Sequence, residues 1–479
     1  MSLTPSWNKF LLVPMLTAVV AGGCSEYDSS FVYSERTTSL IPEAQDGFKG
    51  ASEEAAPVAG VKQLLDDRFG NPQDLKAWLK LPVDFGGTPS AVAEYSAADG
   101  VATVKFSFEE GKSLPGSASS VQLVTGGAAG ETLSISSWDA TTGQATLEGL
   151  PSKELAAGDS CVIDGGTVMQ SGRVLYMRHC SHCHGTSGDG AGPTAQYLNP
   201  RPRDYRHGIF KFTSTTDVSK ASRTDIKRVL QYGIPGTYMP SFLLLTDDEI
   251  HALVEYVRFL ALRGEYERKL VNELAGDFSQ KAVASRTEGG ESRDSIIAEL
   301  KEMLAGDIVD AATSIGDGMS EDWSVSDTEE ALIVPSVPRV PDSPESRRRG
   351  RELYLSKTLN CADCHGVDGA GNGPQTIAYE KNPITGEPYN EAGLHDVWDN
   401  LNQPRNLHTG IYRGGRRPID LFSRIHAGIK GSRMPSFKNT PHEDIWHVVN
   451  YVLSIPFETE PGATGVPVAA AAAAAPAAP

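Results

Sequence analysis

The sequence predicts a mainly α-helical protein in which one helical domain occurs twice, preceded by a small β-rich module. The pattern Cys-x-x-Cys-His occurs at 180–184 and again at 361–365. Each copy is followed by a glycine-rich stretch, a Pro-Arg step, a Met-Pro-Ser-Phe segment and an amphipathic helix. Residues 86–166 instead show alternating or β-branched stretches between Gly, Ala and Ser turns, as short strands do.

The first residues form an export signal. Lys9 precedes an apolar run of about a dozen residues, which is too short to cross a bilayer as a mature helix. The run ends in Ala-Gly-Gly-Cys, which resembles a bacterial lipobox, so we expect removal of 1–23 and lipidation of Cys24. Because Ala21 stands where that pattern usually has Leu, ordinary signal cleavage is the alternative. The expected product is an exported lipoprotein, anchored to a membrane on its periplasmic side.

Residues 24–85 are expected to form a lipidated N-terminus and tether, and 86–166 the β-rich module. The module shows no evident chemistry, so a spacer or docking role is favoured over ligand binding. Its single cysteine, Cys161, is expected to be a buried, inert thiol.

The first helical domain is expected at 167–265. Gly172 and Tyr176 share one helix face before the cysteines, because they are four residues apart. The closing helix begins at Thr246, which forms a capping box with Glu249, and its apolar stripe ends near residue 262.

The second helical domain, 341–457, repeats this order with Gly350 and Tyr354 in the equivalent places. Its cysteines lie farther from its Pro-Arg step, which indicates an insertion at 380–399. The remaining segments are a partly helical linker at 266–340 and a disordered Ala/Pro tail at 458–479.

Cys-x-x-Cys-His is the attachment sequence of c-type haem. Two thiols three residues apart on a short helix reach the same macrocycle, and the next residue places an imidazole below it. Structural zinc would need four ligands, and each repeat offers about three close together. A thiol-redox pair is expected within a βαβ pattern, and none is visible. Two covalently bound haem c groups are therefore favoured, with zinc and thiol redox chemistry as alternatives.

Both helical domains resemble the class I c-type cytochrome family over residues 170–262 and 347–455. The resemblance implies a tandem dihaem cytochrome c, similar to bacterial lipoprotein cytochromes, in which the attachment His and a later Met bind each iron. It implies thioether bonds at Cys180, Cys183, Cys361 and Cys364, and iron ligation by His184 with Met239 and by His365 with Met434.

Further groups are expected around each iron, the first of them from the same resemblance. The carbonyls of Pro193 and Pro374 are expected to accept a hydrogen bond from the ligating imidazoles. Arg203 and Arg405 either pair with haem propionates or stay solvated beside their proline turns. Matching Met-Pro-Ser-Phe segments favour Met ligation. The alternative is a bis-His site that uses one of the other candidate histidines, His207, His408 or His426.

Iron with His and Met in its axial positions has no position open for oxygen or peroxide. The resemblance therefore implies a one-electron carrier of a bacterial respiratory chain, alone or as a subunit of a respiratory oxidoreductase complex, and not an enzyme. A formal charge of −18 argues against nucleic acid. It is typical of a soluble acidic surface or of docking to basic partners: a quinol-oxidising complex, a terminal oxidase or a soluble cytochrome.

The alternative function is a dihaem cytochrome c peroxidase-like enzyme with one haem open to peroxide. Such an enzyme should lack a distal ligand at one site. Met239 and Met434 stand in equivalent contexts, so the sequence shows no such asymmetry. A haem-based sensor is disfavoured for the same reason, because sensing needs an open or displaceable position.

Overall fold

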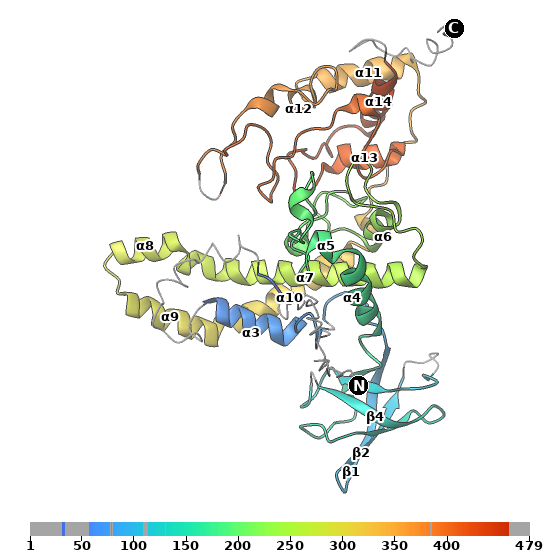
Figure 1. Ribbon diagram of the computed structural model, residues 1–479, viewed down its shortest axis with the longest axis vertical. Coiled ribbons are helices and arrows are strands. Elements are labelled where there is room, and N and C mark those ends of the chain that lie inside the picture. The colour runs from blue at the N-terminus through green and yellow to red at the C-terminus, as the bar shows by residue number, and fades with distance from the viewer. Residues whose placement is uncertain are drawn as a thin grey trace, which may run out of the picture.

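The computed structural model describes residues 31–33 and 57–458, apart from 77, 79, 109–113, 130 and 384–385. The predicted signal peptide, Cys24 and the Ala/Pro tail after residue 458 lie outside the described residues. Figure 1 shows an elongated molecule, with the strands at one end, the long helix α7 across the middle and helices α11 to α14 at the other end.

The β-rich module is a closed barrel of antiparallel strands, in agreement with the prediction for this segment. Alternate side chains point inward, as in β2, where Ala102, Val104 and Phe106 are buried. Cys161 is buried in β6, and burial raises the pKa of its thiol to about 11. Around the barrel the strands are β1 (Thr88–Ala98), β2 (Val101–Ser107), β5 (Gln144–Leu147), β4 (Thr132–Asp139), β3 (Ser120–Leu123) and β6 (Ser160–Ile163).

Two helices of the first helical domain cross closely at a glycine. A Cβ on Gly172 of α4 would lie 2.2 Å from the carbonyl oxygen of Ala252 in α7. Beside this contact the rings of Tyr176 and Tyr256 pack with centroids 5.2 Å apart. The helices of this domain are α4 (Thr167–His179), α5 (Ser181–His184), α6 (Arg223–Tyr232) and α7 (Asp247–Phe278).

Helix α7 continues well past the predicted end of the closing helix. It runs to Phe278 because buried residues such as Leu270 and Leu274 extend its apolar face into a second set of contacts. The extension shares one core with α3 and α10, where buried Trp323 donates its indole N–H to Glu265 at 2.9 Å. Part of the predicted linker therefore packs on the first domain. The added helices are α3 (Pro57–Phe69), α8 (Gln280–Glu288), α9 (Arg293–Ala305) and α10 (Asp307–Val325).

The second helical domain repeats the close crossing. A Cβ on Gly350 would lie 2.0 Å from the carbonyl oxygen of His447, and the rings of Tyr354 and Tyr451 lie 5.4 Å apart. Its helices are α11 (Pro344–Leu355), α12 (Ala362–His365), α13 (Pro418–Ala427) and α14 (His442–Ser454). Single 3₁₀ turns in the two domains and between them lie at Ala195–Tyr197, Tyr205–His207, Glu329–Ala331, Pro374–Ile377, Leu407–Thr409 and Ile455–Phe457.

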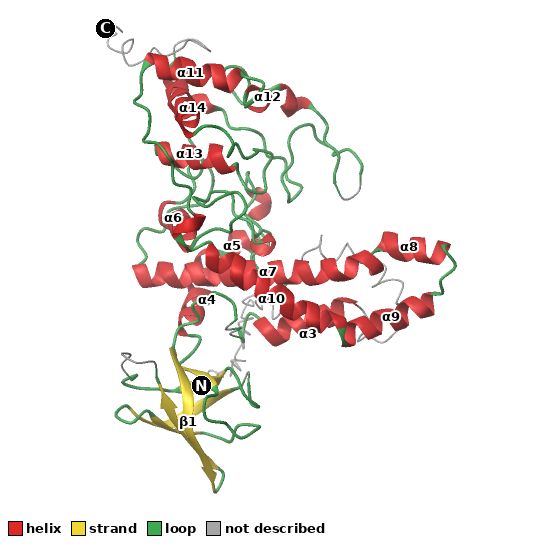
Figure 2. Ribbon diagram, turned by 180° about the vertical axis from the view of Figure 1, so that it is seen from behind, coloured by secondary structure: helices red, strands yellow, loops and turns green. Residues whose placement is uncertain are grey.

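The two helical domains touch along a polar contact that we call the domain seam. Arg228 of α6 pairs with Asp420 of α13 at 2.7 Å, and the Asp420 side chain is only 4% exposed. Lys430 of the second domain donates to the hydroxyl of Thr215 in the first domain at 2.9 Å. Figure 2 shows the same arrangement from behind, with the strands confined to the barrel.

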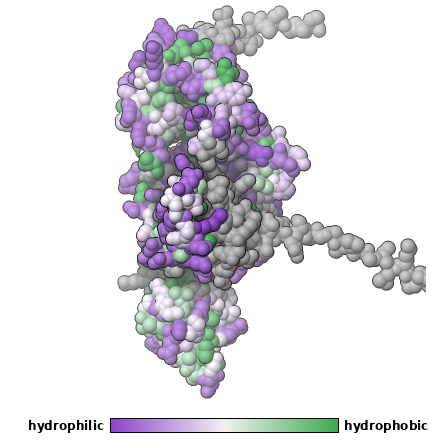
Figure 3. All heavy atoms as spheres, turned by 90° about the vertical axis from the view of Figure 1, so that its left-hand side faces the viewer, coloured by the Kyte–Doolittle hydropathy of each residue, from purple (hydrophilic) through white to green (hydrophobic). Residues whose placement is uncertain are grey.

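Within the described part of the chain, no helix combines the length and the apolar character needed to cross a membrane. On the face shown in Figure 3, hydrophilic side chains prevail over the helical parts and apolar side chains are scattered among them.

Candidate haem sites

The first attachment motif forms a single helical turn directly after α4. The backbone N–H of His184 donates to the carbonyl of Cys180 at 2.8 Å, so the two cysteines and the histidine follow helical geometry. Below this turn, buried Tyr176 donates its hydroxyl to the carbonyl of Gly185 at 2.9 Å. The turn therefore has a fixed position against the crossed helices.

His184 offers a neutral imidazole to its surroundings. Its side chain is buried, and burial lowers its pKa to about 4. Nδ1 lies 3.0 Å from the carbonyl oxygen of Arg203, and because a carbonyl can only accept, Nδ1 donates. Nε2 then keeps its lone pair, which is the state in which imidazole binds a metal. The ring of Tyr205 stacks on the imidazole at 4.7 Å and fixes its plane.

The acceptor for the imidazole differs from the expectation for Pro193 and Pro374. In the first domain the acceptor is the carbonyl of Arg203. In the second domain Nδ1 of His365 lies 3.4 Å from the carbonyl of Arg405. The residue that follows the proline of the Pro-Arg step, in both domains, therefore orients the imidazole.

Glycines explain why the Pro-Arg step reaches this position. Gly190 and Gly371 have φ angles of 71° and 79°, in the left-handed region that favours glycine. A Cβ on Gly190 would lie 2.7 Å from the carbonyl oxygen of Pro202, and a Cβ on Gly371 would lie 2.6 Å from that of Pro404. Because Gly190 and Gly371 carry no Cβ, the glycine-rich loops close directly onto the Pro-Arg segments and hold them near the histidines.

Met239 lies in a loop held by its own backbone. The carbonyl of Met239 accepts from the N–H of Ile234 at 3.1 Å, and its N–H donates to the hydroxyl of Thr237 at 3.1 Å. Gly233 packs against this loop with a φ of 65°, where a Cβ would lie 2.6 Å from the Met239 carbonyl oxygen. The thioether is thus carried on a rigid turn.

Met434 lies in the same kind of loop in the second domain. Its carbonyl accepts from Ile429 at 3.2 Å, and its N–H donates to the hydroxyl of Ser432 at 3.2 Å. Gly428, with a φ of 72°, packs against this loop as Gly233 does in the first domain. The repeat therefore preserves the local hydrogen bonding around each methionine, and not only the sequence.

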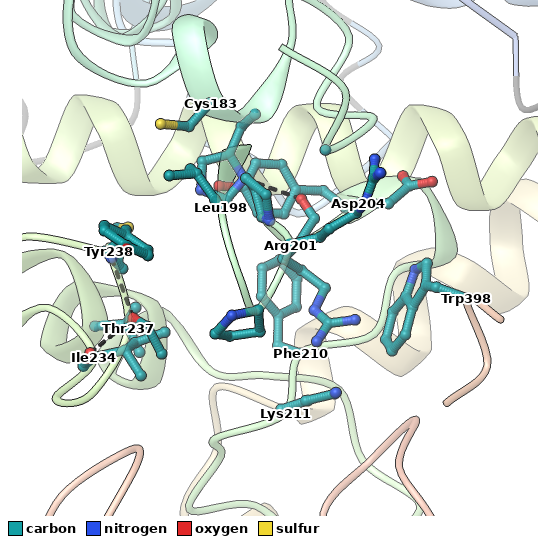
Figure 4. A pocket seen from close by; sticks show the side chains of 18 of the residues that line it. Cys183, Leu198, Arg201, Asp204, Phe210, Lys211, Ile234, Thr237, Tyr238 and Trp398 are labelled. Atoms are coloured by element: carbon teal, nitrogen blue, oxygen red, sulfur yellow. Dashed lines mark hydrogen bonds between the residues drawn. The ribbon is translucent and has the colours of Figure 1, made fainter. Parts of the chain in front are cut away.

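A cavity of about 1250 Å³ connects the predicted residues of the first domain, and Figure 4 shows part of its lining. Cofactor sites typically measure roughly 300–1,000 Å³, so a macrocycle has room here. The lining includes the predicted attachment and ligand residues Cys180, Cys183, His184 and Met239.

Two cations of the first domain, Arg203 and Lys211, line the cavity. Burial lowers the pKa of Arg203 to about 10, although Asp396 opposes the shift. Burial and the nearby Arg203 lower the pKa of Lys211 to about 8. Within the described residues, the buried Nε atoms of Arg405 and Arg413 have no hydrogen-bond partner. Arg203 thus lies where it could pair with a cofactor carboxylate, as considered above for Arg203 and Arg405.

Sequence reasoning missed the part of the first site that the second domain contributes. Asp396 and Trp398 lie in the predicted insertion and line the cavity of the first domain. The guanidinium carbon of Arg203 lies 3.6 Å above the ring of Trp398. The length difference between the repeats revealed an insertion, but no local pattern reveals which distant surface such a loop will contact.

The three other candidate histidines lie in different surroundings. His207 lines the cavity and stacks on Trp398 with centroids 5.3 Å apart. His426 lies on α13, where its ring stacks on Phe422 at 6.0 Å. His408 lies in a 3₁₀ turn, where its backbone N–H donates to the side-chain oxygen of Asn406.

The alternative chemistries of the cysteines find little support. Among the described residues, no three His, Cys, Asp or Glu side chains are grouped as a metal ion would require. Burial raises the pKa of Cys180 and of Cys361 to about 12, whereas a thiol-redox cysteine needs a lowered pKa.

Comparisons with known proteins bear on the two helical domains. The family model described as Cytochrome c matches the chain twice, at 169–261 and 348–456. No curated protein matches the chain. Among solved structures, a chain of the Kuenenia stuttgartiensis reducing HAO-like protein complex is 23% identical with a TM-score of 0.40. The match covers 60% of this chain and 96% of that one. The two matched regions are tandem domains of the cytochrome c family.

Proposed function

We propose that this protein is a dihaem electron carrier of a bacterial respiratory chain, with both irons bound by His and Met. The observation that supports this most directly is the duplicated geometry. In each domain, the imidazole is oriented by a carbonyl, the methionine sits on a hydrogen-bonded turn, and two cysteines form one helical turn with the histidine. The first iron would be bound by His184 and Met239, and the second by His365 and Met434.

Haem, when bound, supplies one-electron redox chemistry at each site. The protein's part is to hold both ligands in place: the Arg203 carbonyl and the Tyr205 ring orient His184, and backbone hydrogen bonds fix the Met239 turn. Iron held by the His184 imidazole and the Met239 thioether would have no position open for oxygen or peroxide. This ligand set supports electron transfer over catalysis.

A lipid on Cys24 would hold the first haem domain close to a membrane. Phe31 is buried against Phe259, and the N–H of Val32 donates to the hydroxyl of Ser187 at 2.7 Å. Phe31 follows Cys24 by only seven positions, a reach of at most about 25 Å. The first domain could then exchange electrons with a membrane-bound partner, such as a quinol-oxidising complex or a terminal oxidase, or with a soluble cytochrome.

The anchor is tested by replacing the lipidated thiol. We expect Cys24→Ser to move the protein from the membrane fraction to the soluble periplasmic fraction, with two haems still attached. A Cys24→Ser protein that stays on the membrane would contradict the lipid anchor.

The electron-carrier function is tested by carbon monoxide. The reduced wild-type protein should hold two haems per chain and bind no carbon monoxide. We expect Met239→Ala or Met434→Ala to remove about half of the near-infrared sulfur-to-iron absorption and to open one haem to the gas, because each removes one axial ligand. Met177→Ala is the control, since Met177 packs against the apolar core of the first domain.

Two outcomes would overturn the proposal. Carbon monoxide binding at one haem of the wild-type protein would favour the peroxidase-like alternative. A near-infrared absorption that survives the loss of both Met239 and Met434 would exclude these methionines as ligands.

A further inference from the structure

The insertion of the second domain lies against the cavity of the first. Asp396, Trp398 and Arg413, all from the second domain, line that cavity together with first-domain residues. Figure 4 shows Trp398 and Lys211 on the side of the cavity away from Cys183. The site proposed for the first haem is therefore built from both domains.

The inserted loop has a defined structure. One carboxylate oxygen of Asp396 accepts from the N–H of Trp398 at 3.0 Å and of Asn400 at 3.2 Å. The N–H of Val397 donates to the carbonyl of Gly431 at 3.0 Å, and a Cβ on Gly431 would lie 2.5 Å from the Trp398 ring. The loop is thus pinned to the turn that carries the methionine of the second domain.

The same loop holds two cations of the first domain. The second carboxylate oxygen of Asp396 accepts from Lys211 at 2.9 Å and lies 3.9 Å from Arg203. The Arg203 guanidinium stacks on Trp398 at 3.6 Å. The Asp396 and Lys211 side chains are 5% and 11% exposed, so this contact is largely shielded from solvent and its charges are weakly screened.

The charges at this contact do not balance within the protein. Arg203 and Lys211 share the single carboxylate of Asp396, and the charge of nearby Arg413 lowers the pKa of Lys211. No ion-pair partner of Arg413 lies among the described residues, and its buried Nε has no hydrogen-bond partner there. Burial and the neighbouring Arg405 lower the pKa of Arg413, which shows that its charge is poorly compensated. Asp204, also in the lining, is already paired with Arg206 at 2.9 Å. A half-buried surplus of positive charge of this kind is stabilised by an added anion.

We infer that the second domain completes the first haem site: Arg413 and Asp396 flank the carboxylates of the first haem at the domain seam and set its reduction potential. This inference rests on the proposed function. Arg203 from the first domain and Arg413 from the second supply positive charge for those carboxylates, Asp396 positions Arg203 and Lys211, and Trp398 supports the Arg203 guanidinium.

The sign of each effect follows from electrostatics. Reduction adds one electron, so nearby positive charge favours the reduced haem and nearby negative charge favours the oxidised haem. Removing the charge of Arg413 should therefore lower the first potential, and removing the charge of Asp396 should raise it. A steric or folding defect would not reverse its sign between these two variants.

The test is a redox titration of the full-length dihaem protein followed by visible absorption. The two potentials are assigned with Met239→His, which should lower the first one only. We expect Arg413→Gln to lower the equilibrium constant for reduction of the first haem about tenfold and Asp396→Asn to raise it about tenfold. A tenfold change corresponds to about 59 mV for a one-electron couple. The second potential should move less in both variants.

Two further variants serve as controls. Arg416→Gln removes the same charge from an exposed position three residues away and should leave the first potential unchanged. Arg413→Lys keeps the charge and should restore most of the potential, which also separates charge from loss of folding. Three results would overturn the inference. Arg413→Gln could leave the first potential as unchanged as Arg416→Gln does, or Arg413→Gln and Asp396→Asn could shift the first potential in the same direction. The second potential could also shift as much as the first. If the peptide with Cys180 and Cys183 carries no haem, the proposed function itself fails.

Discussion

At the scale of single residues, the two domains share one buried hydrogen bond that supports the attachment turn. Tyr176 donates to the carbonyl of Gly185 at 2.9 Å, and Tyr354 donates to the carbonyl of Gly366 at 2.7 Å. Each hydroxyl satisfies a carbonyl directly after the attachment histidine. If the tyrosine hydroxyl is removed, the buried carbonyl is left without a donor and without water. The loss of this bond therefore costs more free energy than the net contribution of a typical hydrogen bond.

We expect Tyr176→Phe to lower the free energy of unfolding of the first domain by about 1–3 kcal/mol, because the Gly185 carbonyl is left unpaired. Denaturant unfolding followed by haem absorption measures the effect. Tyr256→Phe is a matched control in the same ring pair: the buried Tyr256 hydroxyl has no hydrogen-bond partner among the described residues. Its loss should be neutral or stabilising. Equal destabilisation by both variants would contradict this interpretation.

At the scale of helices, a glycine decides how closely the first and last helices of each domain cross. At Gly172 and Gly350 a Cβ would lie 2.2 Å and 2.0 Å from a carbonyl oxygen of the partner helix. The same crossing brings Tyr176 onto Tyr256 and Tyr354 onto Tyr451. Since the attachment turn follows the first helix directly, the crossing also sets where the cysteines lie.

Gly350→Ala should destabilise the second domain, although alanine is the better helix former. Helix propensity alone favours the substitution by about 1 kcal/mol, whereas the clash with the His447 carbonyl costs about 1–3 kcal/mol or more. Gly276 of α7 has no atom within 4 Å of an added Cβ, so Gly276→Ala should instead stabilise by about 0.5–1 kcal/mol. Thermal unfolding of both variants compares the signs, and stabilisation by Gly350→Ala would show that the crossing is looser.

At the scale of the whole molecule, buried charges hold the two haem domains together. Burial alone would raise the pKa of Asp420, but its bonds to Arg417 and the charge of Arg228 outweigh burial and hold the pKa below its usual value. The charged carboxylate thus contributes stability that is fully present above the unfolded pKa of about 3.9. That contribution is lost as the pH falls through the lower pKa of the folded protein.

We therefore expect Asp420→Asn to cost about 1.5–3 kcal/mol at pH 7, as for the loss of a hydrogen bond to a charged group. Below about pH 4 the difference between the variant and the wild type should shrink, because the wild type is also losing the charge. Unfolding free energies measured from pH 2 to pH 7 test this. Asp247→Asn, in the exposed pair with Lys227, should have little effect at any pH. A constant difference over the whole range would contradict the role of the Asp420 charge.

The local features of both sites could be read from the sequence. The two Cys-x-x-Cys-His turns, the methionine turns and the β-rich module lie where the sequence predicted them, because each depends on contacts within a few residues. Helix α7 is an exception: its stripe continues past the predicted end because Leu270 and Leu274 pack on helices from distant parts of the chain.

The sequence alone determined that this protein carries two copies of a haem-attachment domain, because spacing along a helical turn fixes which groups reach one macrocycle. Only the tertiary structure decided how the copies combine. It placed the carbonyls of Arg203 and Arg405 beside the imidazoles, and it brought Asp396 and Trp398 of the second domain to the first cavity. Those contacts join residues up to about two hundred positions apart, and packing and charge balance set them, not local spacing.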